Sequence, residues 1–312
     1  MGAGRGREGN VRSMPAVAGC GPLLRAISRV AAVAAVALAP CATALAQQPP
    51  GGDNLGLELV DPKVLRVCAD PANLPFSNEH GEGFENKIAE LLAAKLDKRL
   101  AYTWYPQSTG FVRMTLGSFR CDVILGFPQG GDLAQSTNPY YRSVYALVTR
   151  QDAELDGIDT LADARLKGKR LGIVAGTPPA TYLVAGGLMA TAKPYALVVD
   201  TRFDSSGRAM TQDIASGEIA AGILWGPIAG WQARQIDPPL HVVPLLKDGG
   251  GPSLSYRITM GVRPTDQNWR RELNAVIRDN QPAMTKILLD YGVPLLDEGG
   301  HVIAGAPPAA KP

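Results

Sequence analysis

Three carboxylates near the start of the folded region could carry acid–base chemistry. Asp70 follows an apolar run, and Glu82 and Glu85 stand at the start of an amphipathic pattern. Carboxylates in different surroundings can act as general acid and general base. Acids at a helix start also interact favourably with the helix macrodipole, and this second interpretation is favoured. The sequence has no GxSxG elbow, no GxxxxGK[ST] loop, no GxGxxG after a strand and no paired histidines on a helix. We therefore predict no catalytic residues and no enzyme activity.

The segment VLRVCADPANLPFSNEHGEGFENK, residues 64–87, reads as a strand, a polar loop with two prolines and an amphipathic helix. In open α/β sheets, ligands and partners bind beyond the carboxyl ends of the strands. Alternatively, the prolines only stiffen a long turn and the phenylalanine plugs the core. The binding interpretation predicts that this loop lines a cleft through Asp70, Asn73, Pro75, Phe76 and Ser77.

Other strand ends add aromatic and amide side chains to the predicted cleft. Aromatic residues beside hydrogen-bond donors suit either a flat organic ligand or a protein interface. Tryptophans at strand ends can instead cap the cores of their lobes. The candidates are Trp104, Gln107, Phe127, Gln129 and Trp225.

Two further residues could bind an anion. Thr177 precedes Pro178 and Pro179, where a helix start would offer backbone N–H groups and a hydroxyl. Arg142 could reach a ligand from its position after two tyrosines, although a role near the hinge or in the core fits it as well. Both residues belong to the predicted binding cleft.

Periodicity after residue 61 predicts two successive βαβαβ units and hence an α/β fold. The first unit has strands at 64–69, 100–104 and 121–126 with a helix at 111–119; the second has strands at 169–174, 195–199 and 220–225 with helices at 178–189 and 207–217. Extended segments 145–150 and 255–262 form a two-strand hinge, and a helix at 268–279 packs on the first unit. We predict lobe one as 62–150 plus 256–300 and lobe two as 151–255.

The first residues are predicted to be an export signal. Five arginines and the apolar run 30–38 precede Ala44-Leu45-Ala46, which suits signal peptidase, so residues 1–46 are removed. The run is too short to span a bilayer. Residues 47–61 are predicted to be a flexible tether and 301–312 a disordered tail. The protein is expected in the periplasm, without membrane insertion.

Charge, cysteine and histidine content limit which partners and bound groups we expect. Residues 1–46 contain five of the 31 Lys and Arg residues and one of the 29 Asp and Glu residues. The predicted mature chain therefore has 26 basic and 28 acidic residues. A near-neutral mature chain does not favour nucleic acid. Cys68 and Cys121 are the two cysteines of the predicted mature chain, and they could form a disulfide or remain two buried free thiols. A strand that starts at Cys121 would offset the two residues along the sheet, so their Cα atoms could be too far apart for a disulfide. Scattered histidines predict no metal site, and no cofactor is predicted.

Several long blocks resemble the periplasmic binding-protein-like accessory proteins of quinoprotein methanol dehydrogenases, the MxaJ and XoxJ type. Besides 64–87, these blocks are YTWYPQSTGFVRMTL (102–116), AGTPPATYL (175–183), WGPIAGW (225–231) and DYGVPLLDE (290–298). The resemblance covers nearly all of the predicted mature chain. It implies a type-2 periplasmic binding protein fold and, as partner, a dehydrogenase that uses pyrroloquinoline quinone (PQQ).

The chain departs from the amino-acid binders of this fold. Those proteins generally place an arginine after the third strand of lobe one and an acid after the equivalent strand of lobe two. Here the chain reads FPQGGDLAQS after Gly126 and places Gly226 where the acid is expected. We therefore expect a non-catalytic accessory of a PQQ-dependent methanol or alcohol dehydrogenase. One alternative is the receptor of an ABC permease for a small organic solute, for which an amino acid is not expected. The other is a dehydratase-like enzyme.

Overall fold

The computed structural model describes residues 58–151 and 154–303. The predicted signal peptide, and most of the predicted tether and tail, lie outside these ranges. Within them, no helix combines the length and apolar character needed to cross a membrane.

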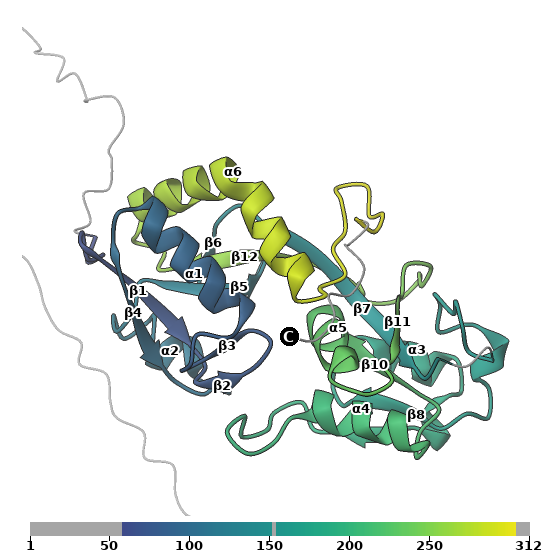
Figure 1. Cartoon of the computed structure of the whole chain (residues 1–312). Helices are drawn as coiled ribbons and strands as arrows, with labels where there is room; N and C mark the ends of the chain where they lie inside the picture. The colour runs from purple at the N-terminus through teal and green to yellow at the C-terminus, as the bar shows by residue number, and fades with distance from the viewer. Residues whose placement is uncertain (1–57, 152–153, 304–312) are drawn as a thin grey trace, which may run out of the picture. The chain divides into compact units, whose positions relative to one another are not determined.

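The first half of the sheet, here called lobe one, is formed by strands in the order β4-β1-β5-β12 (Figure 1). β1 is parallel to both neighbours, whereas β12 is antiparallel to β5. The elements of lobe one are β1 (Val64–Ala69), the two-residue strands β2 (Ala72–Asn73) and β3 (Ser77–Asn78), α1 (Phe84–Lys95), β4 (Arg99–Trp104), α2 (Phe111–Met114), β5 (Val123–Pro128), β6 (Gln135–Ser136), β12 (Ser255–Val262) and α6 (Gln267–Asp290).

The second half, lobe two, continues the order with β10-β8-β9, all three parallel. Its elements are β8 (Leu171–Val174), α3 (Pro179–Ala185), β9 (Lys193–Tyr195), α4 (Ser206–Ser216), β10 (Ala221–Trp225), α5 (Gly226–Arg234) and β11 (His241–Pro244). The sequence thus predicted the alternation of strands and helices in both lobes, and the mixed α/β sheet agrees with the predicted fold class.

One long strand, β7 (Tyr141–Thr149), belongs to both lobes. Its first residues pair antiparallel with β12, and the remainder, from Tyr145, pairs with β10 on one side and β11 on the other. Figure 1 shows β7 running from the lobe-one sheet into lobe two. This strand and β12 are the predicted hinge strands. We propose that the lobe boundaries remain those read from the sequence, 62–150 plus 256–300 and 151–255.

The helices of lobe one cover one face of its sheet through apolar positions at helical spacing. α1 buries Phe84, Ile88 and Leu92, and α6 buries Trp269 and Leu273 along the facing stripe. These spacings are those of an amphipathic helix. Burial of these large side chains fixes α1, and therefore fixes the β1–α1 loop that the sequence singled out.

Several predicted boundaries were wrong. The helix expected over 111–119 stops at Met114, and Gly117 and Phe119 (φ 58°) turn the chain back toward β1. The strand expected over 195–199 ends at Tyr195 and continues as a loop. The helix expected over 268–279 continues to Asp290 through a kink, where Asn280 departs from helical geometry before Pro282.

Residues at both ends of the described range form hydrogen bonds with the rest of the chain. Glu58, assigned to the flexible tether, accepts hydrogen bonds from the first N–H groups of α6, at Asn268 (2.6 Å) and Trp269 (3.2 Å). A carboxylate at this position satisfies free helix donors. At the other end, Ile303 donates its N–H to the carbonyl of Leu295 at 2.8 Å. Residues from the predicted tether and the predicted tail thus take part in these contacts.

Candidate functional site

A cavity of about 790 Å³ lies between the β1–α1 loop of lobe one and lobe two. Lobe two contributes the 196–205 loop, the first turn of α4 and one side of α5. In Figure 1 the loop before α4 extends toward β2 and β3. This volume is within the range of small-molecule sites, and the cavity lies at the strand ends where the fold places ligands.

Asp70 organises the lobe-one wall instead of facing the cavity. Its side chain is buried, and its carboxylate accepts hydrogen bonds from the N–H groups of Ala72 (2.9 Å) and Gln107 (2.6 Å). Ser77 adds two bonds to the Asp70 backbone. These bonds fold the loop over the end of β1, because each satisfies a buried backbone or side-chain polar group.

Asp70 also joins the two lobes. The hydroxyl of Thr201, in the 196–205 loop of lobe two, lies 3.0 and 3.2 Å from the two Asp70 carboxylate oxygens. The bond links residues 131 positions apart across the cavity mouth. Lobe two therefore contacts the β1–α1 loop in this structure.

Five predicted cleft residues line the cavity: Asn73, Phe76, Gln107, Thr177 and Trp225. The amide of Asn73 donates to the side-chain oxygen of Gln107 at 2.9 Å, and Trp225 packs edge-on against Tyr145. The predicted helix-start anion site at Thr177 is not formed as expected. The Thr177 hydroxyl donates its proton to the Val174 carbonyl at 2.7 Å, so this proton is not available to an anion.

The other predicted cleft residues lie elsewhere. Besides Asp70, both Pro75 and Ser77 are buried behind the loop surface. Trp104 stacks on Tyr102 with ring centroids 4.4 Å apart and packs on the lobe-one core. These positions fit the alternative considered from the sequence, in which strand-end and loop residues complete a core.

Three more residues were predicted to line the cleft but do not: Phe127, Gln129 and Arg142. Phe127 is 7% exposed and belongs to a cluster on the second face of the lobe-one sheet. Gln129 is exposed on the turn after β5, outside the cavity lining. Arg142 donates to the hydroxyl of Ser255 at 3.0 Å and does not line the cavity. A β-strand alternates its faces, so neighbouring residues at a strand end need not face the same space.

Sequence reasoning missed most of the lobe-two wall. Leu197 and Val198 follow β9 and read as strand, yet they are exposed and line the cavity. On α5, Trp231 lies at the cavity and stacks on Tyr291. The signal available was the polar run TRFDSSGR, which lies between a strand and a helix as the first loop does and includes the first residues of α4.

Glu85, one of the three carboxylates first considered, is buried beneath the cavity wall. It is 7% exposed and lies against Gly126, where an added Cβ would meet its Oε1 at 2.2 Å. Burial, with a smaller contribution from the charge of Asp70, raises the pKa of Glu85 to about 8. Glu82 instead accepts a hydrogen bond from Asn78 at 2.7 Å. The three carboxylates therefore do not converge on one space in the cavity.

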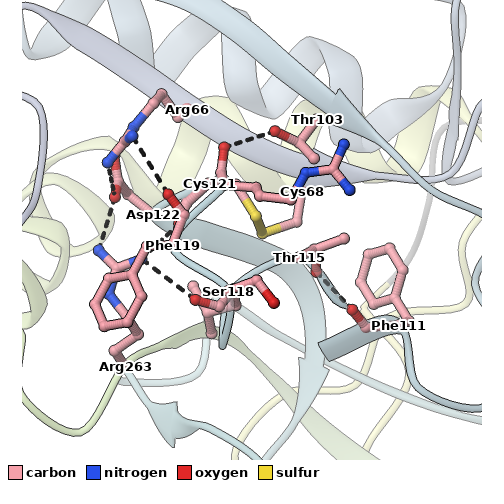
Figure 2. Close-up of a disulfide and its surroundings, with 12 residues drawn as sticks. Arg66, Cys68, Thr103, Phe111, Thr115, Ser118, Phe119, Cys121, Asp122 and Arg263 are labelled. Carbon is pink, nitrogen blue, oxygen red and sulfur yellow. Dashed lines mark hydrogen bonds and ion pairs between the residues drawn. A yellow bond between two sulfur atoms is a disulfide. The ribbon is translucent and has the colours of Figure 1, made fainter. Parts of the chain in front are cut away.

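Cys68 and Cys121 form a disulfide, with Cα atoms 5.4 Å apart (Figure 2). This settles the alternative left open by the sequence. Both residues are buried in the same cluster as Phe127. The bond ties the end of β1 to the segment that leads into β5.

Beside the disulfide, a buried carboxylate binds two arginines (Figure 2). Asp122 Oδ1 lies 2.6 Å from the guanidinium of Arg66 and 2.7 Å from that of Arg263. The hydrogen bond to Asp122 raises the pKa of Arg66. Arg263 also contacts Asp266 at 2.6 Å. Paired charges and hydrogen bonds are what buried ions require, and this cluster joins β1 to the residues before β5 and after β12.

Among the described residues, no three His, Cys, Asp or Glu side chains are grouped closely enough to hold a metal ion. The two lobes, the shared strand β7 and the cavity between the strand ends are those of the periplasmic binding protein class.

Comparisons with known proteins agree with that class. Residues 129–293 match the family model of bacterial extracellular solute-binding proteins. MoxJ of Methylorubrum extorquens is 31% identical over 252 residues, covering 76% of this chain and 83% of MoxJ. MoxJ of Paracoccus denitrificans is 30% identical over 256 residues, covering 76% of this chain and 91% of that protein. The crystal structure of periplasmic binding protein XoxJ from Methylobacterium extorquens AM1 has a TM-score of 0.65 and 42% identity, covering 75% of this chain and all of XoxJ. The chain therefore belongs to the MoxJ-related family of bacterial extracellular solute-binding proteins.

Proposed function

We propose that the protein is a non-catalytic, periplasmic accessory of a PQQ-dependent methanol or alcohol dehydrogenase, acting in its maturation, activation or assembly. The observation that carries the proposal is the similarity to MoxJ and XoxJ over about three quarters of the chain. The quoted blocks of the sequence point to the same accessory family. Export by the predicted signal peptide would bring the protein to the periplasm, the compartment proposed for this role.

The cavity supports a non-catalytic role. Asp70 is committed to backbone N–H groups and to Thr201, and Glu85 lies outside the cavity lining. Acid–base catalysis needs a proton donor or acceptor within hydrogen-bond reach of a bound substrate. The dehydratase-like alternative therefore lacks the pair of carboxylates that it requires.

The rival function is the receptor of an ABC permease. An amino-acid receptor would need a guanidinium clamp, and Arg142 is directed to Ser255 instead. At the acid position after β10, Gly226 approaches lobe one so closely that an added Cβ would meet the Val144 carbonyl oxygen at 2.4 Å. These two observations argue against an amino-acid cargo.

Free amino acids are expected to bind no better than millimolar. Gly226 stands where an acid would hold the ammonium group, and burying that charge without a partner costs on the order of 2–5 kcal/mol. Isothermal titration calorimetry of the mature protein with the common amino acids measures this directly. A micromolar dissociation constant for any of them would favour the permease receptor over the accessory.

Replacing Trp225 with alanine is expected to weaken capture of the dehydrogenase by about 2 kcal/mol or more, since hot spots concentrate in aromatic anchors. Trp225 is half-buried at the cavity, with Tyr145 and Tyr256 beside it. A periplasmic pull-down with the parent and the variant measures the effect, after thermal melts show equal stability. Leu133→Ala, an exposed apolar residue outside the cavity lining, is the control.

The pull-down tests the proposal in two ways. Capture of a quinoprotein dehydrogenase by the parent supports the accessory role. If the parent captures no dehydrogenase, the permease-receptor function is favoured instead. Undiminished capture by Trp225→Ala removes the cavity from the partner interface while leaving the accessory role intact.

A further inference from the structure

We propose that the cavity binds the carboxylate of a small planar ring compound, with the carboxylate held at the first turn of α4. This inference goes beyond the proposed accessory role and does not depend on it, because the protein alone would bind the compound. Four features of the described residues carry it: free helix donors, an unpartnered buried amide, an unpaired arginine and an aromatic lining.

The first turn of α4 presents two free donors at the cavity. The side chain of Ser205 caps the helix by accepting from Arg208 N–H at 3.3 Å, and Ala209 N–H donates to the Ser205 carbonyl. The N–H groups of Ser206 and Gly207 have no acceptor among residues 58–151 and 154–303. Both residues line the cavity. Free N–H groups at a helix start, together with the helix dipole, favour an anion.

Gln232 on α5 is the second, independent observation. It is 8% exposed and lines the cavity, yet its amide makes no hydrogen bond with any described residue. Its Cγ lies 3.5 Å from the position that a Cβ of Gly207 would occupy, so this side chain lies beside the first turn of α4. A ligand oxygen placed there would accept from Gln232 and from the helix start together.

Glycine at position 207 makes this arrangement possible. A Cβ there would meet the side chain of Ile228 at 2.5 Å. Because glycine has no side chain, α5 approaches the start of α4 closely and brings Gln232 beside it. The close approach of the two helices thus builds one wall of the cavity.

One arginine at the cavity has no acidic partner among the described residues and is available to an anion. Arg208 lines the cavity and has no carboxylate partner among the described residues. Arg202 is neutralised by Asp200 at 2.7 Å, and Asp204 accepts the N–H of Ser205 at 2.7 Å. Asp70 is already satisfied by donors, as described above. Arg208 is therefore the cation available to a ligand, and a guanidinium prefers a carboxylate.

The remaining lining selects a planar apolar body. Phe76, Tyr145, Trp225 and Trp231 surround the space, and the cavity of about 790 Å³ accommodates fused rings. Aromatic side chains pack favourably against the faces and edges of other rings. A carboxylate at α4 with rings extending toward these side chains would satisfy both parts of the cavity.

The test compares 2-naphthoate with the uncharged 2-naphthamide, by calorimetry and by quenching of tryptophan fluorescence in the mature protein. We expect 2-naphthoate to bind in the micromolar range and the amide about tenfold more weakly or worse, because only the acid satisfies Arg208 and the helix start. Equal affinities for the two compounds, or no binding of the acid, would overturn the proposal.

Two substitutions locate the anion. Arg208→Gln and Gln232→Glu should each lower 2-naphthoate affinity about tenfold or more while leaving 2-naphthamide affinity nearly unchanged. Arg208 is exposed, so its variant is expected to fold normally. Arg170→Gln, which removes an exposed arginine paired with Glu218 outside the cavity, is the matched control and should bind like the parent. An unchanged preference for the acid in Arg208→Gln would contradict the assignment, whatever the outcome with the dehydrogenase.

Discussion

Reducing the disulfide between Cys68 and Cys121 is expected to lower the free energy of unfolding by about 4 kcal/mol. The two cysteines are 53 residues apart, and a crosslink over that length strongly restricts the unfolded chain. In the folded state the bond is buried beside Phe111, Leu116 and Phe127. It therefore stabilises the face of the lobe-one sheet opposite α1 and α6.

Thermal unfolding with and without reductant measures this effect. For a protein of this size, a loss of about 4 kcal/mol corresponds to a midpoint lower by roughly 8–16 °C. The double variant Cys68→Ser, Cys121→Ser should unfold near the reduced parent and should not respond to reductant. If complete reduction, verified by alkylation, left the parent midpoint unchanged, the stabilising role would be refuted.

The disulfide also shows where sequence reasoning reached its limit. Both cysteines and the oxidising compartment could be read from the sequence, but a strand beginning at Cys121 would have offset the pair along the sheet. In the structure β5 begins at Val123, and Val67 pairs with Val123. The turn at Phe119, with φ 58°, brings Cys121 back to the end of β1. A two-residue error in a strand boundary was enough to leave the pairing open.

The cavity was predictable only in part. Parallel strands place their carboxyl ends together, which located Asn73, Phe76 and Trp225 from the order of strands and loops. Phe127 could not be assigned from spacing. It packs against Gly261 of β12, a strand 134 residues away in sequence, and an added Cβ on that glycine would lie 3.0 Å from the Phe127 ring. Which face of β5 meets β12 depends on long-range pairing that periodicity does not contain.

The lobe-two wall depended on two features that no local pattern displays. The apolar run after β9 leaves the sheet at Tyr195, so Leu197 and Val198 become loop residues at the cavity. Gln232 is a buried residue of α5, and its Cγ lies beside Gly207, where α4 approaches α5 closely. Tertiary packing therefore decided which of the polar residues carry the proposed ligand chemistry.

Glu85→Gln is expected to stabilise the protein at pH 8 by on the order of 4 kcal/mol and to have little effect near pH 4.5. The pKa of Glu85 is raised from 4.5 to about 8 in the folded protein, mainly by burial. As pH rises from about 4.5 to about 8, the unfolded chain loses the proton while the folded protein keeps it. The parent therefore loses stability through this window, because its unfolded state binds fewer protons than its folded state.

Denaturant unfolding at a series of pH values measures the free energy of unfolding for the parent and the variant. Besides Asp70, the groups that interact with Glu85 are the phenols of Tyr102, Tyr140 and Tyr141. Burial raises the pKa of each above its usual value, so all three stay neutral throughout the window. Glu90→Gln on the same helix is the matched control, since Glu90 is exposed and pairs with Lys87. Its pH profile should follow that of the parent. Parallel profiles for the parent and Glu85→Gln would show that Glu85 is already ionised when folded, and the carboxylate would then have to be paired or hydrated beneath Gly126.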